Sequence, residues 1–333
     1  MVEDRKVVAG EDYPGTWSEF LKWFPDEAAC AGYLERLRWR GEFACPSCGV
    51  VGAPYRASRN RLMCVTCEHQ TSVTAGTLFD KTRTPLTVWF AAAWYLTSQK
   101  HGVSALGLQR VLGLGSYQTA WTLVHRFRRA MVRPDRTPLQ GAVQVDETYV
   151  ELAARAPSGA QGLIGKRRTG KLLVVMAVET LEPSGIGRIR LQRIPAAAQE
   201  HVQPFIEASI DPRAAVHTDG SMLYSFLDRE GYRHIRTIVQ DVNSRPIASL
   251  PAVNRVASLL KRWLLGTHHG AVQPSQLDHY LEEFVFRFNR RNSRSRGMLF
   301  YRLLEQAAQS GPVTYRDVVD GRPPMLPVTI DWS

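Results

Sequence analysis

The chain is long, basic and of ordinary globular composition. It has 333 residues, of which 44% are hydrophobic and 22% charged, enough for two or three domains with buried cores. Lys and Arg number 42 against 31 Asp and Glu, which gives a formal net charge of +11. An excess of that size predicts a polyanionic partner, either nucleic acid or an anionic membrane surface.

Other features argue against a membrane-spanning or secreted protein. The longest apolar run, from Val88 to Leu96, has nine residues, whereas a membrane-spanning helix needs about 20. The N-terminal segment has no apolar stretch that could serve as a signal peptide. Five cysteines, four of them in two CxxC pairs, are typical of metal ligands in a reducing compartment. We therefore expect a cytoplasmic protein that binds nucleic acid.

The sequence of the N-terminal region predicts a polar arm, a helix, a cysteine-bearing segment and a second helix. Residues 1–14 are polar, and a Pro-Asp pair at 25–26 supplies the start of a helix from Glu27 to Trp39. Residues 41–80 contain glycines and both CxxC pairs. Leu86 to Thr97 is apolar on nearly every side, so it predicts a fully buried helix.

The next segment has the pattern of a DNA-reading helix-turn-helix. Ser104 to Leu112 predicts one helix, two glycines mark a break, and Ser116 caps a second helix that reaches about Met131. Polar residues at the start of the second helix are placed to reach base edges, and arginines further along it to hold phosphates. The residues concerned are Tyr117, Gln118, Thr119, Thr122, Arg126, Arg128 and Arg129. The alternative is an ordinary helical hairpin with a solvated basic face.

Beyond a Pro-rich linker at residues 132–140, the hydrophobic period changes from helical to strand-like. Three consecutive strands, then alternating helices and strands, predict a mixed α/β sheet covered by helices. The expected strands are Ala142–Glu151, Lys171–Glu179, Arg188–Ile194, Ala214–Thr218 and His234–Val239. The expected helices are Ala198–Ser209, Ser221–Glu230, Val253–Leu265 and Leu277–Asn289. Prolines after Gln309 predict an extended tail.

Four cysteines form the most specific pattern in the chain. Cys45 and Cys48 make one CxxC pair, Cys64 and Cys67 a second, and fifteen residues separate the pairs. This spacing is that of a zinc ribbon, in which two tight knuckles place four thiolates around Zn²⁺. The expected site is structural, one Zn²⁺ per chain, because no coordination position remains for water. The alternative, free thiols or a redox pair, fits two matched pairs poorly. Gly49 is expected to take a positive φ and to donate its N–H to a ligand sulfur.

Two aspartates fall on expected strands. Asp146 lies within Val-Gln-Val-Asp-Glu-Thr-Tyr, and Asp219 follows Ala-Val-His-Thr at the C-terminal end of a later strand. If these strands are neighbours, the two carboxylates can converge on Mg²⁺ or Mn²⁺, which prefer oxygen ligands. Glu147 should point to the opposite face of the sheet, because side chains alternate along a strand. The alternative is a surface acid at 146 and an Asp-Gly turn at 219.

Longer stretches resemble a known family. The run from Cys45 to Met131, then VDETYV, HTDG, NRVASLLKRWLLGTHHGAV and YLEEFVFRFNRR, is similar to the IS1595 (ISXO2-like) family of bacterial insertion-sequence transposases. The resemblance implies a ribonuclease H-like catalytic domain in which Asp146 and Asp219 are the first two catalytic residues. The third ligand of the family, usually Glu, is followed seven residues later by Lys. These positions hold Asn254 and Lys261 here, which share one helical face.

The resemblance also implies a reaction. Two divalent ions, Mg²⁺ or Mn²⁺, are expected about 3.5–4 Å apart, held by Asp146, Asp219 and Asn254. They would support strand cleavage at the ends of the element and strand transfer into target DNA. An amide oxygen at Asn254 can still bind Mg²⁺, though without the charge of a carboxylate, and Lys261 is expected to position a phosphate. Asp241 and Glu282 are other acids near these segments, but neither matches the family pattern.

The expected partners are double-stranded DNA at the terminal inverted repeats and at the target, and further copies of the chain, since two ends must be brought together. Residues 1–135 are expected to bind the ends without the catalytic domain. The expected domains are a polar arm (1–14), a helix and zinc ribbon (15–80), the helix-turn-helix-like segment (81–135), the catalytic domain (136–310) and a tail (311–333). The alternatives are a non-catalytic DNA-binding regulator derived from such an enzyme, and a structure-selective nuclease of the same fold.

Overall fold

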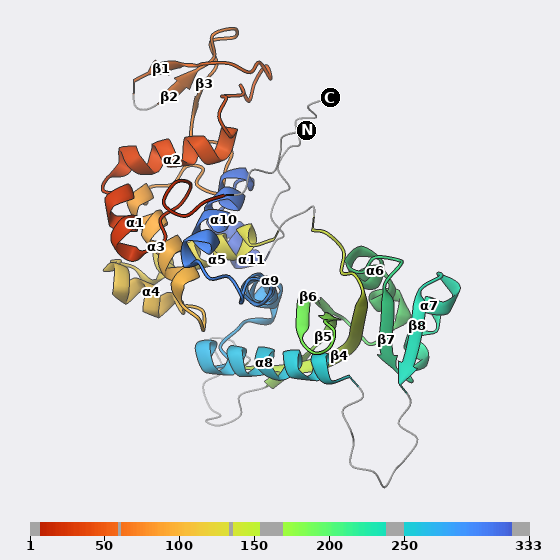
Figure 1. Cartoon of the computed structure of the whole chain (residues 1–333). Coiled ribbons are helices and arrows are strands. Elements are labelled where there is room, and N and C mark those ends of the chain that lie inside the picture. Colours follow the sequence, from red (N-terminus) through yellow and green to blue (C-terminus); the bar gives the residue numbers. More distant parts are fainter. Residues whose placement is uncertain (1–6, 59–60, 133–135, 154–168, 238–249, 322–333) are drawn as a thin grey trace. The chain divides into compact units, whose positions relative to one another are not determined.

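The computed structural model divides the chain into two compact units (Figure 1). The residues that it describes are 7–58, 61–132, 136–153, 169–237 and 250–321. Unit 1 is Met1–Pro134 with Ser293–Ser333, and unit 2 is Asp135–Asn292. Unit 2 is thus inserted into the chain of unit 1. The expected boundary at residue 310 is wrong, because the chain returns to unit 1 after Asn292.

Unit 1 combines helices with a small antiparallel sheet. Its helices are α1 (Trp17–Trp23), α2 (Glu27–Trp39), α3 (Leu86–Ser98), α4 (Ala105–Leu112), α5 (Tyr117–Ala130), α10 (Arg296–Gln309) and α11 (Tyr315–Asp320). Its strands are β1 (Tyr55–Ala57), β2 (Arg61–Met63) and β3 (Gln70–Ser72), in the order β1-β2-β3. Side chains of Asp26, Ser104 and Ser116 accept backbone N–H groups at the starts of α2, α4 and α5, which confirms these three helix starts.

Helix α10 completes the core of unit 1, and the sequence did not predict it. It packs against α2, α3 and α5. The buried ring of Phe300 contacts five other aromatic rings, those of Phe20, Phe24, Tyr33, Phe90 and Trp94. At Gly297 the backbone of α10 comes so close to the N-terminal segment that a Cβ would lie 1.8 Å from the carbonyl oxygen of Pro14. The tail is also not extended throughout, since α11 begins at Tyr315 with a capping box.

Unit 2 is built on a five-stranded mixed sheet. Its strands are β4 (Ala142–Ala153), β5 (Thr169–Thr180), β6 (Ile186–Ile194), β7 (Ala215–Asp219) and β8 (Arg233–Thr237), in the order β6-β5-β4-β7-β8. β5 is antiparallel to β4 and β6, whereas β7 is parallel to β4 and β8. Its helices are α6 (Gln199–Ser209), the 3₁₀ helix η1 (Met222–Tyr224), α7 (Phe226–Arg229), α8 (Pro251–His268), the 3₁₀ helix η2 (Pro274–Gln276) and α9 (Leu277–Asn289).

Helices cover both faces of this sheet, and strand β5 shows why. Val174 and Met176 pack into a cluster with residues of α8 and α9, whereas Val175 and Ala177 pack into a second cluster with α6, η1 and α7. Both sets are buried, so β5 reads as a continuous hydrophobic run instead of an alternating one. The structure confirms the expected mixed α/β sheet covered by helices. None of the described helices has both the length and the apolarity needed to cross a membrane.

Candidate active site and zinc cluster

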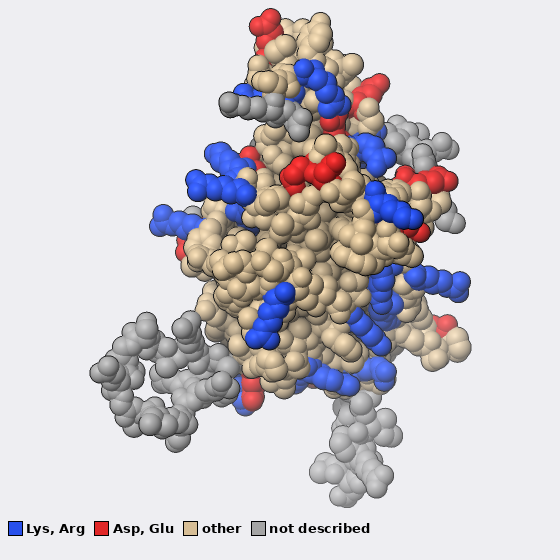
Figure 2. Space-filling model, turned by 90° about the vertical axis from the view of Figure 1, so that its left-hand side faces the viewer, with Lys and Arg blue, Asp and Glu red and all other residues tan. Residues whose placement is uncertain are grey.

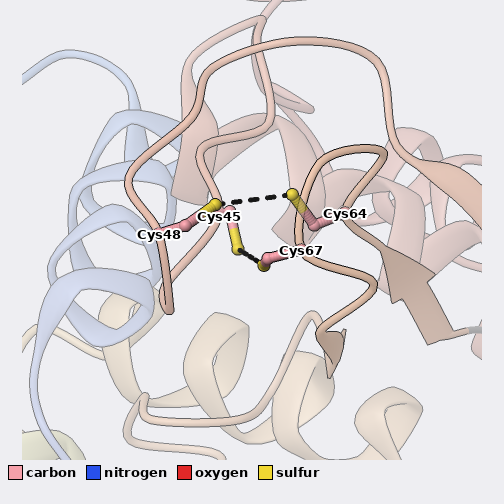
Figure 3. Close-up of side chains that lie close together, drawn as sticks. All are labelled: Cys45, Cys48, Cys64 and Cys67. Carbon is pink, nitrogen blue, oxygen red and sulfur yellow. Dashed lines mark hydrogen bonds between the residues drawn. The ribbon is translucent and has the colours of Figure 1, made fainter.

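Two loops of unit 1 bring the four predicted cysteines together, with their sulfurs turned toward one another (Figure 3). All four sulfurs lie within 4.8 Å of each other, and the Cys45–Cys67 and Cys48–Cys64 sulfur pairs are 3.6 Å apart. Four Zn–S bonds of about 2.3 Å in a tetrahedron place sulfurs roughly 3.8 Å apart, so this cluster fits a zinc ion. Among the residues that the structure describes, no other group of His, Cys, Asp and Glu side chains is spaced in this way.

The two knuckles share one backbone pattern. In each, the first cysteine sulfur accepts an N–H two residues later, from Ser47 or Thr66, at 3.4 Å. Gly49 has a φ of 75°, as expected, but its N–H donates to the Cys45 carbonyl at 2.9 Å. The expected bond from Gly49 to a sulfur is therefore wrong. Glu68 occupies the matching position of the second knuckle at a φ of 56°, a region that favours glycine.

The charge state of the thiols follows from these contacts. Backbone N–H groups of Cys67 and Thr66 lower the pKa of Cys64 to about 6. At Cys48 the N–H of Val50 lowers the pKa, but hydrogen bonds with the other sulfurs and burial outweigh it and raise it to about 12. Zinc is bound by cysteine in its thiolate form, so metal binding at this cluster would release the proton of Cys48.

The predicted helix-turn-helix corresponds to α4 and α5, which pack against each other. Gly113 ends α4 with a φ of 61°, and α5 begins four residues later. Tyr117 and Gln118 are exposed at the start of α5, while Thr119 and Thr122 are half-buried. The hydroxyl of Thr122 donates to the Gln118 carbonyl at 2.7 Å. The first turn of α5 therefore presents polar side chains to the surface of unit 1.

Two of the three arginines of α5 are buried, although the sequence predicts that they are exposed. Arg128 and Arg129 are each only 2% exposed. Arg128 Nη1 bonds with His125 Nε2 at 3.1 Å, and Arg129 donates to the carbonyl of Asp317 in α11. Buried guanidinium groups cannot reach a phosphate backbone, so the expected phosphate contacts of these two residues are wrong. Only Arg126 is partly exposed. On the face in Figure 2, Lys and Arg side chains are spread out, with Asp and Glu among them.

Strand pairing in unit 2 places the two predicted aspartates side by side. The parallel register of β4 and β7 pairs Ala142 with Ala215 and Gln144 with His217. Asp146 and Asp219 lie two residues beyond this last pair on their strands, and the charge of Asp219 acts on Asp146. Asp146 shares a face of β4 with Gln144, because side chains alternate along a strand. Neighbouring strands lie about 4.8 Å apart, so two carboxylates meet on one face of the sheet. Both side chains are half-buried.

Helix α8 brings the third predicted position to the same face. Its apolar side packs on β4 and β5 through the cluster that contains Val253 and Val256. Gln144 Oε1 accepts the N–H groups of Ala252 at 2.9 Å and Val253 at 3.2 Å, which ties the first turn of the helix to β4. Asn254 follows directly in that turn and is exposed. Lys261, seven residues later, is exposed on the same helical face.

Glu147 points away from this site, as the strand alternation predicts. It accepts a hydrogen bond from the hydroxyl of Tyr224, which belongs to the cluster on the other face of the sheet. Burial raises the pKa of Glu147 to about 7, opposed by the Tyr224 hydrogen bond and increased by the charges of Asp146 and Asp219. Of the other acids considered, Glu282 is bound to Arg136 at 3.0 Å. Asp241 lies outside the described residues.

The electrostatics of the aspartate pair favour a cation. Burial raises the pKa of Asp146; the backbone N–H of Glu147 lowers it, and the nearby charge of Asp219 raises it again. Asp219 accepts the N–H of Ser221 at 3.0 Å, which holds its carboxylate at the strand end. Burial and like charge both disfavour two ionised carboxylates without a counter-ion.

Sequence reasoning missed the residues that support these ligands. Gln144 caps α8 from a neighbouring strand. On the other side of the site, the buried side chain of His234 bonds through Nε2 with the Thr218 hydroxyl at 2.8 Å, and that hydroxyl donates to the Asp219 carbonyl. The only hint of Gln144 in the sequence was a polar residue between two valines on a strand of strong β-formers. Its partner lies more than a hundred residues away, so no local pattern identified it.

Two family models match this chain. Residues 138–289 match the ISXO2-like transposase domain, and residues 25–70 match the transposase zinc-ribbon domain. The first range contains the Asp146, Asp219 and Asn254 site, and the second contains the four cysteines. The chain is also 28% identical over 279 residues to an uncharacterized protein in the transposable element ISH50 of Halobacterium salinarum. That alignment covers 80% of this chain and 92% of the relative.

Two solved structures of viral proteins are distantly similar. The catalytic core domain of BIV integrase is 16% identical, with 44% of this chain and 82% of that one covered, at a TM-score of 0.27. The simian T-cell lymphotropic virus intasome, in complex with PP2A regulatory subunit B56 gamma, is 13% identical, with 57% and 66% covered, at a TM-score of 0.26. The two matched regions therefore belong to the zinc-ribbon and catalytic domain families of ISXO2-like insertion-sequence transposases, and together they make up more than half of the chain.

Proposed function

We propose that this protein is a DNA transposase that binds the terminal inverted repeats of its element, cuts a strand at each end and joins the cut end to target DNA. One observation carries the proposal. Asp146 and Asp219 each lie two residues beyond the paired residues Gln144 and His217 of neighbouring parallel strands, and the charge of Asp219 acts on Asp146. The first turn of α8, which contains Asn254, is bonded to Gln144, two residues before Asp146. We infer from this arrangement that three oxygen-bearing side chains, from three separate elements, lie near one place on the sheet.

The chemistry of these side chains suits Mg²⁺ or Mn²⁺. Both cations prefer oxygen ligands, and the set consists of two carboxylates and an amide. Two bound ions would supply a deprotonated nucleophile and charge stabilisation for an in-line displacement at phosphorus. In this scheme Asp146, Asp219 and Asn254 would hold the ions through their side-chain oxygens. No side chain forms a covalent bond to DNA in this scheme.

Lys261 would hold a phosphate next to the acids. It lies two helical turns from Asn254 on the exposed side of α8. A lysine ammonium is a point charge on a flexible stem, suited to a phosphate whose position changes during reaction. We also infer one structural Zn²⁺ in the cysteine cluster. The ribbon and the first turn of α5, with Tyr117, Gln118 and Thr119, would read the element ends.

The test is metal-dependent nicking of end-sequence DNA by matched variants. Asp146→Ala and Asp219→Ala should abolish nicking while end binding is unchanged, because each removes a charged ligand. Asn254→Ala should reduce nicking by less, since a neutral amide attracts a dication more weakly than a carboxylate does. Asp278→Ala is the control, because Asp278 is an exposed aspartate of unit 2 that pairs with Arg193. It should nick like the unmodified protein.

Two outcomes would contradict parts of the proposal. If Asn254→Ala nicks normally at limiting metal, Asn254 is not a ligand. If the unmodified protein binds ends but never nicks, whereas Asn254→Glu does, the chain is a non-catalytic DNA-binding regulator. Joining of the cut end to a second DNA distinguishes a transposase from a nuclease of the same fold. Cross-linking on end DNA would test the expected dimer or higher assembly.

A further inference from the structure

We propose that Gln144 is a positioning residue: by capping α8 from strand β4, it sets where Asn254 lies relative to Asp146. This inference rests on the proposed function, in which Asn254 is a metal ligand. Gln144 does not itself belong to the ligand set. Its role is to keep the strand that carries one ligand and the helix that carries another in a fixed position relative to each other.

The start of α8 depends on Gln144 for its hydrogen bonds. The N-cap residue, Leu250, offers no side-chain cap, and Pro251 has no N–H to satisfy. The next two N–H groups, of Ala252 and Val253, both donate to Gln144 Oε1, at 2.9 and 3.2 Å. The N–H of Asn254 then donates to the Leu250 carbonyl at 3.1 Å. The first N–H groups of a helix have no acceptor within the helix, and at the start of α8 the side chain of Gln144 supplies that acceptor.

The hydrogen bonds that cap α8 lie close in sequence to two of the proposed ligands. Ala252 and Val253 immediately precede Asn254, and Gln144 precedes Asp146 by two residues on the same strand face. The register adds the second aspartate, because Gln144 is paired with His217, two residues before Asp219. One residue is therefore connected to all three elements that carry ligands: Gln144 lies in β4, is paired with β7 and bonds to α8 through its side chain.

Apolar packing alone would not hold this geometry. Val253, Val256 and Leu260 keep α8 on the sheet, but contacts between aliphatic side chains have little directionality and allow a helix to slide or turn slightly. Metal sites tolerate displacements of only about 0.5 Å in their ligands. Hydrogen bonds from a fixed strand supply that direction. Loss of a residue that orients a metal ligand typically weakens metal binding about 10- to 100-fold.

The same unit contains a matched control. Asn289, at the end of α9, accepts the N–H of Ile189 at 2.8 Å and donates to its carbonyl at 3.1 Å. This is also an amide side chain that ties a helix to a strand of the sheet, but it connects α9 with the edge strand β6. A variant at Asn289 removes a tie of the same chemical kind, far along the strand order from the aspartate strands.

The experiment compares Gln144→Met, which has similar length but no comparable acceptor, with Gln144→Asn, Gln144→Glu and Asn289→Leu in the full chain. Three quantities are measured: Mn²⁺ affinity without DNA by electron paramagnetic resonance, the Mg²⁺ concentration for half-maximal nicking, and the unfolding temperature. Gln144→Met and Gln144→Asn should both weaken Mn²⁺ binding and raise the Mg²⁺ midpoint by about tenfold. Gln144→Glu keeps the acceptor oxygens and should stay within about threefold of the unmodified protein.

Asn289→Leu should lower the unfolding temperature without moving either metal measurement. The inference is overturned if Gln144→Asn leaves the metal measurements unchanged, if Asn289→Leu moves them equally, or if Gln144→Glu fails to restore them. Failure of the proposed function gives a different result. In that case the unmodified protein neither binds Mn²⁺ nor nicks, and the positioning role falls with it.

Discussion

Removing α10 should unfold unit 1, although α10 is separated from the rest of that unit by the whole of unit 2. A fragment of residues 1–135, which the sequence suggests is sufficient for end binding, contains the ribbon and α1 to α5 but not this helix. It would expose the faces of α2, α3 and α5 against which α10 packs. We therefore expect the fragment to lack a fixed core and to lose discrimination between end-sequence and random DNA.

The size of the effect follows from what α10 buries. Its large apolar side chains with at most 2% exposure are Leu299, Phe300, Leu303 and Leu304. Burial of each contributes about 1.5–3 kcal/mol, so the four contribute roughly 6–12 kcal/mol. The total stability of a domain is about 5–15 kcal/mol. Loss of α10 therefore removes an amount comparable to the entire free energy of unfolding of unit 1.

The assay compares three proteins. The first is residues 1–135, and the second joins residues 1–134 to 293–321 through a Gly/Ser linker of about 20 residues, whose mean span is roughly 25 Å. The third carries Phe300→Ala in the second protein, which should cost about 3–5 kcal/mol. Near-ultraviolet circular dichroism during heating reports a cooperative core, and fluorescence anisotropy on end and shuffled DNA at several salt concentrations reports recognition.

Of the three proteins, only the joined protein with Phe300 intact should unfold cooperatively and prefer end-sequence DNA. Its affinity for DNA should fall steeply with salt as counterions are released. If residues 1–135 unfold as cooperatively as the joined protein and bind the ends equally well, the reasoning about α10 is refuted. If both proteins fold but neither prefers the ends, the assignment of DNA recognition to unit 1 fails instead.

Gly297→Ala should destabilise unit 1 by about 1–3 kcal/mol, because the new methyl group meets a backbone carbonyl. Gly32→Ala, in α2 with open space around it, should stabilise by about 0.5–1 kcal/mol, so denaturant midpoints that move in the same direction would contradict this reasoning. Glu68→Gly should relieve left-handed backbone strain of roughly 1 kcal/mol and slow zinc release to a chelator, whereas faster release would show that the side chain contributes more than the strain. Cys64→Ser should reduce bound zinc from about one equivalent to near none and make residues 41–80 sensitive to protease; a zinc-free, protease-resistant ribbon would exclude the proposed site.

The sequence by itself determined those features whose causes lie within a few residues. Asp26, Ser104 and Ser116 accept N–H groups two or three positions ahead, so the starts of three helices were visible in the chain. The cysteine cluster was predictable for the same reason, because each CxxC knuckle is a local turn. The orientation of Glu147 away from Asp146 followed from the alternation of a strand, which needs no tertiary information.

Burial of polar groups was decided only by the tertiary structure. Arg128 and Arg129 look like surface cations, because arginine is rarely buried without a partner. Their partners include His125 in the same helix and a carbonyl of Asp317, nearly two hundred residues later. Nothing near the arginines in the sequence indicates that carbonyl. The helix after Asn292 was missed for a related reason, since its apolar face has its partners in α2 and α3.

The candidate site was likewise predictable in part from the sequence and in part only from the tertiary structure. The sequence could identify Asp146, Asp219 and Asn254 as residues, but not the pairing of β4 with β7 that makes the aspartates neighbours, nor the capping of α8 by Gln144. Strand pairing joins segments about seventy residues apart, and its register depends on which faces become buried when the whole sheet forms. Local propensity acts over a few residues, whereas a site assembled from three elements exists only once the core that packs them together has formed.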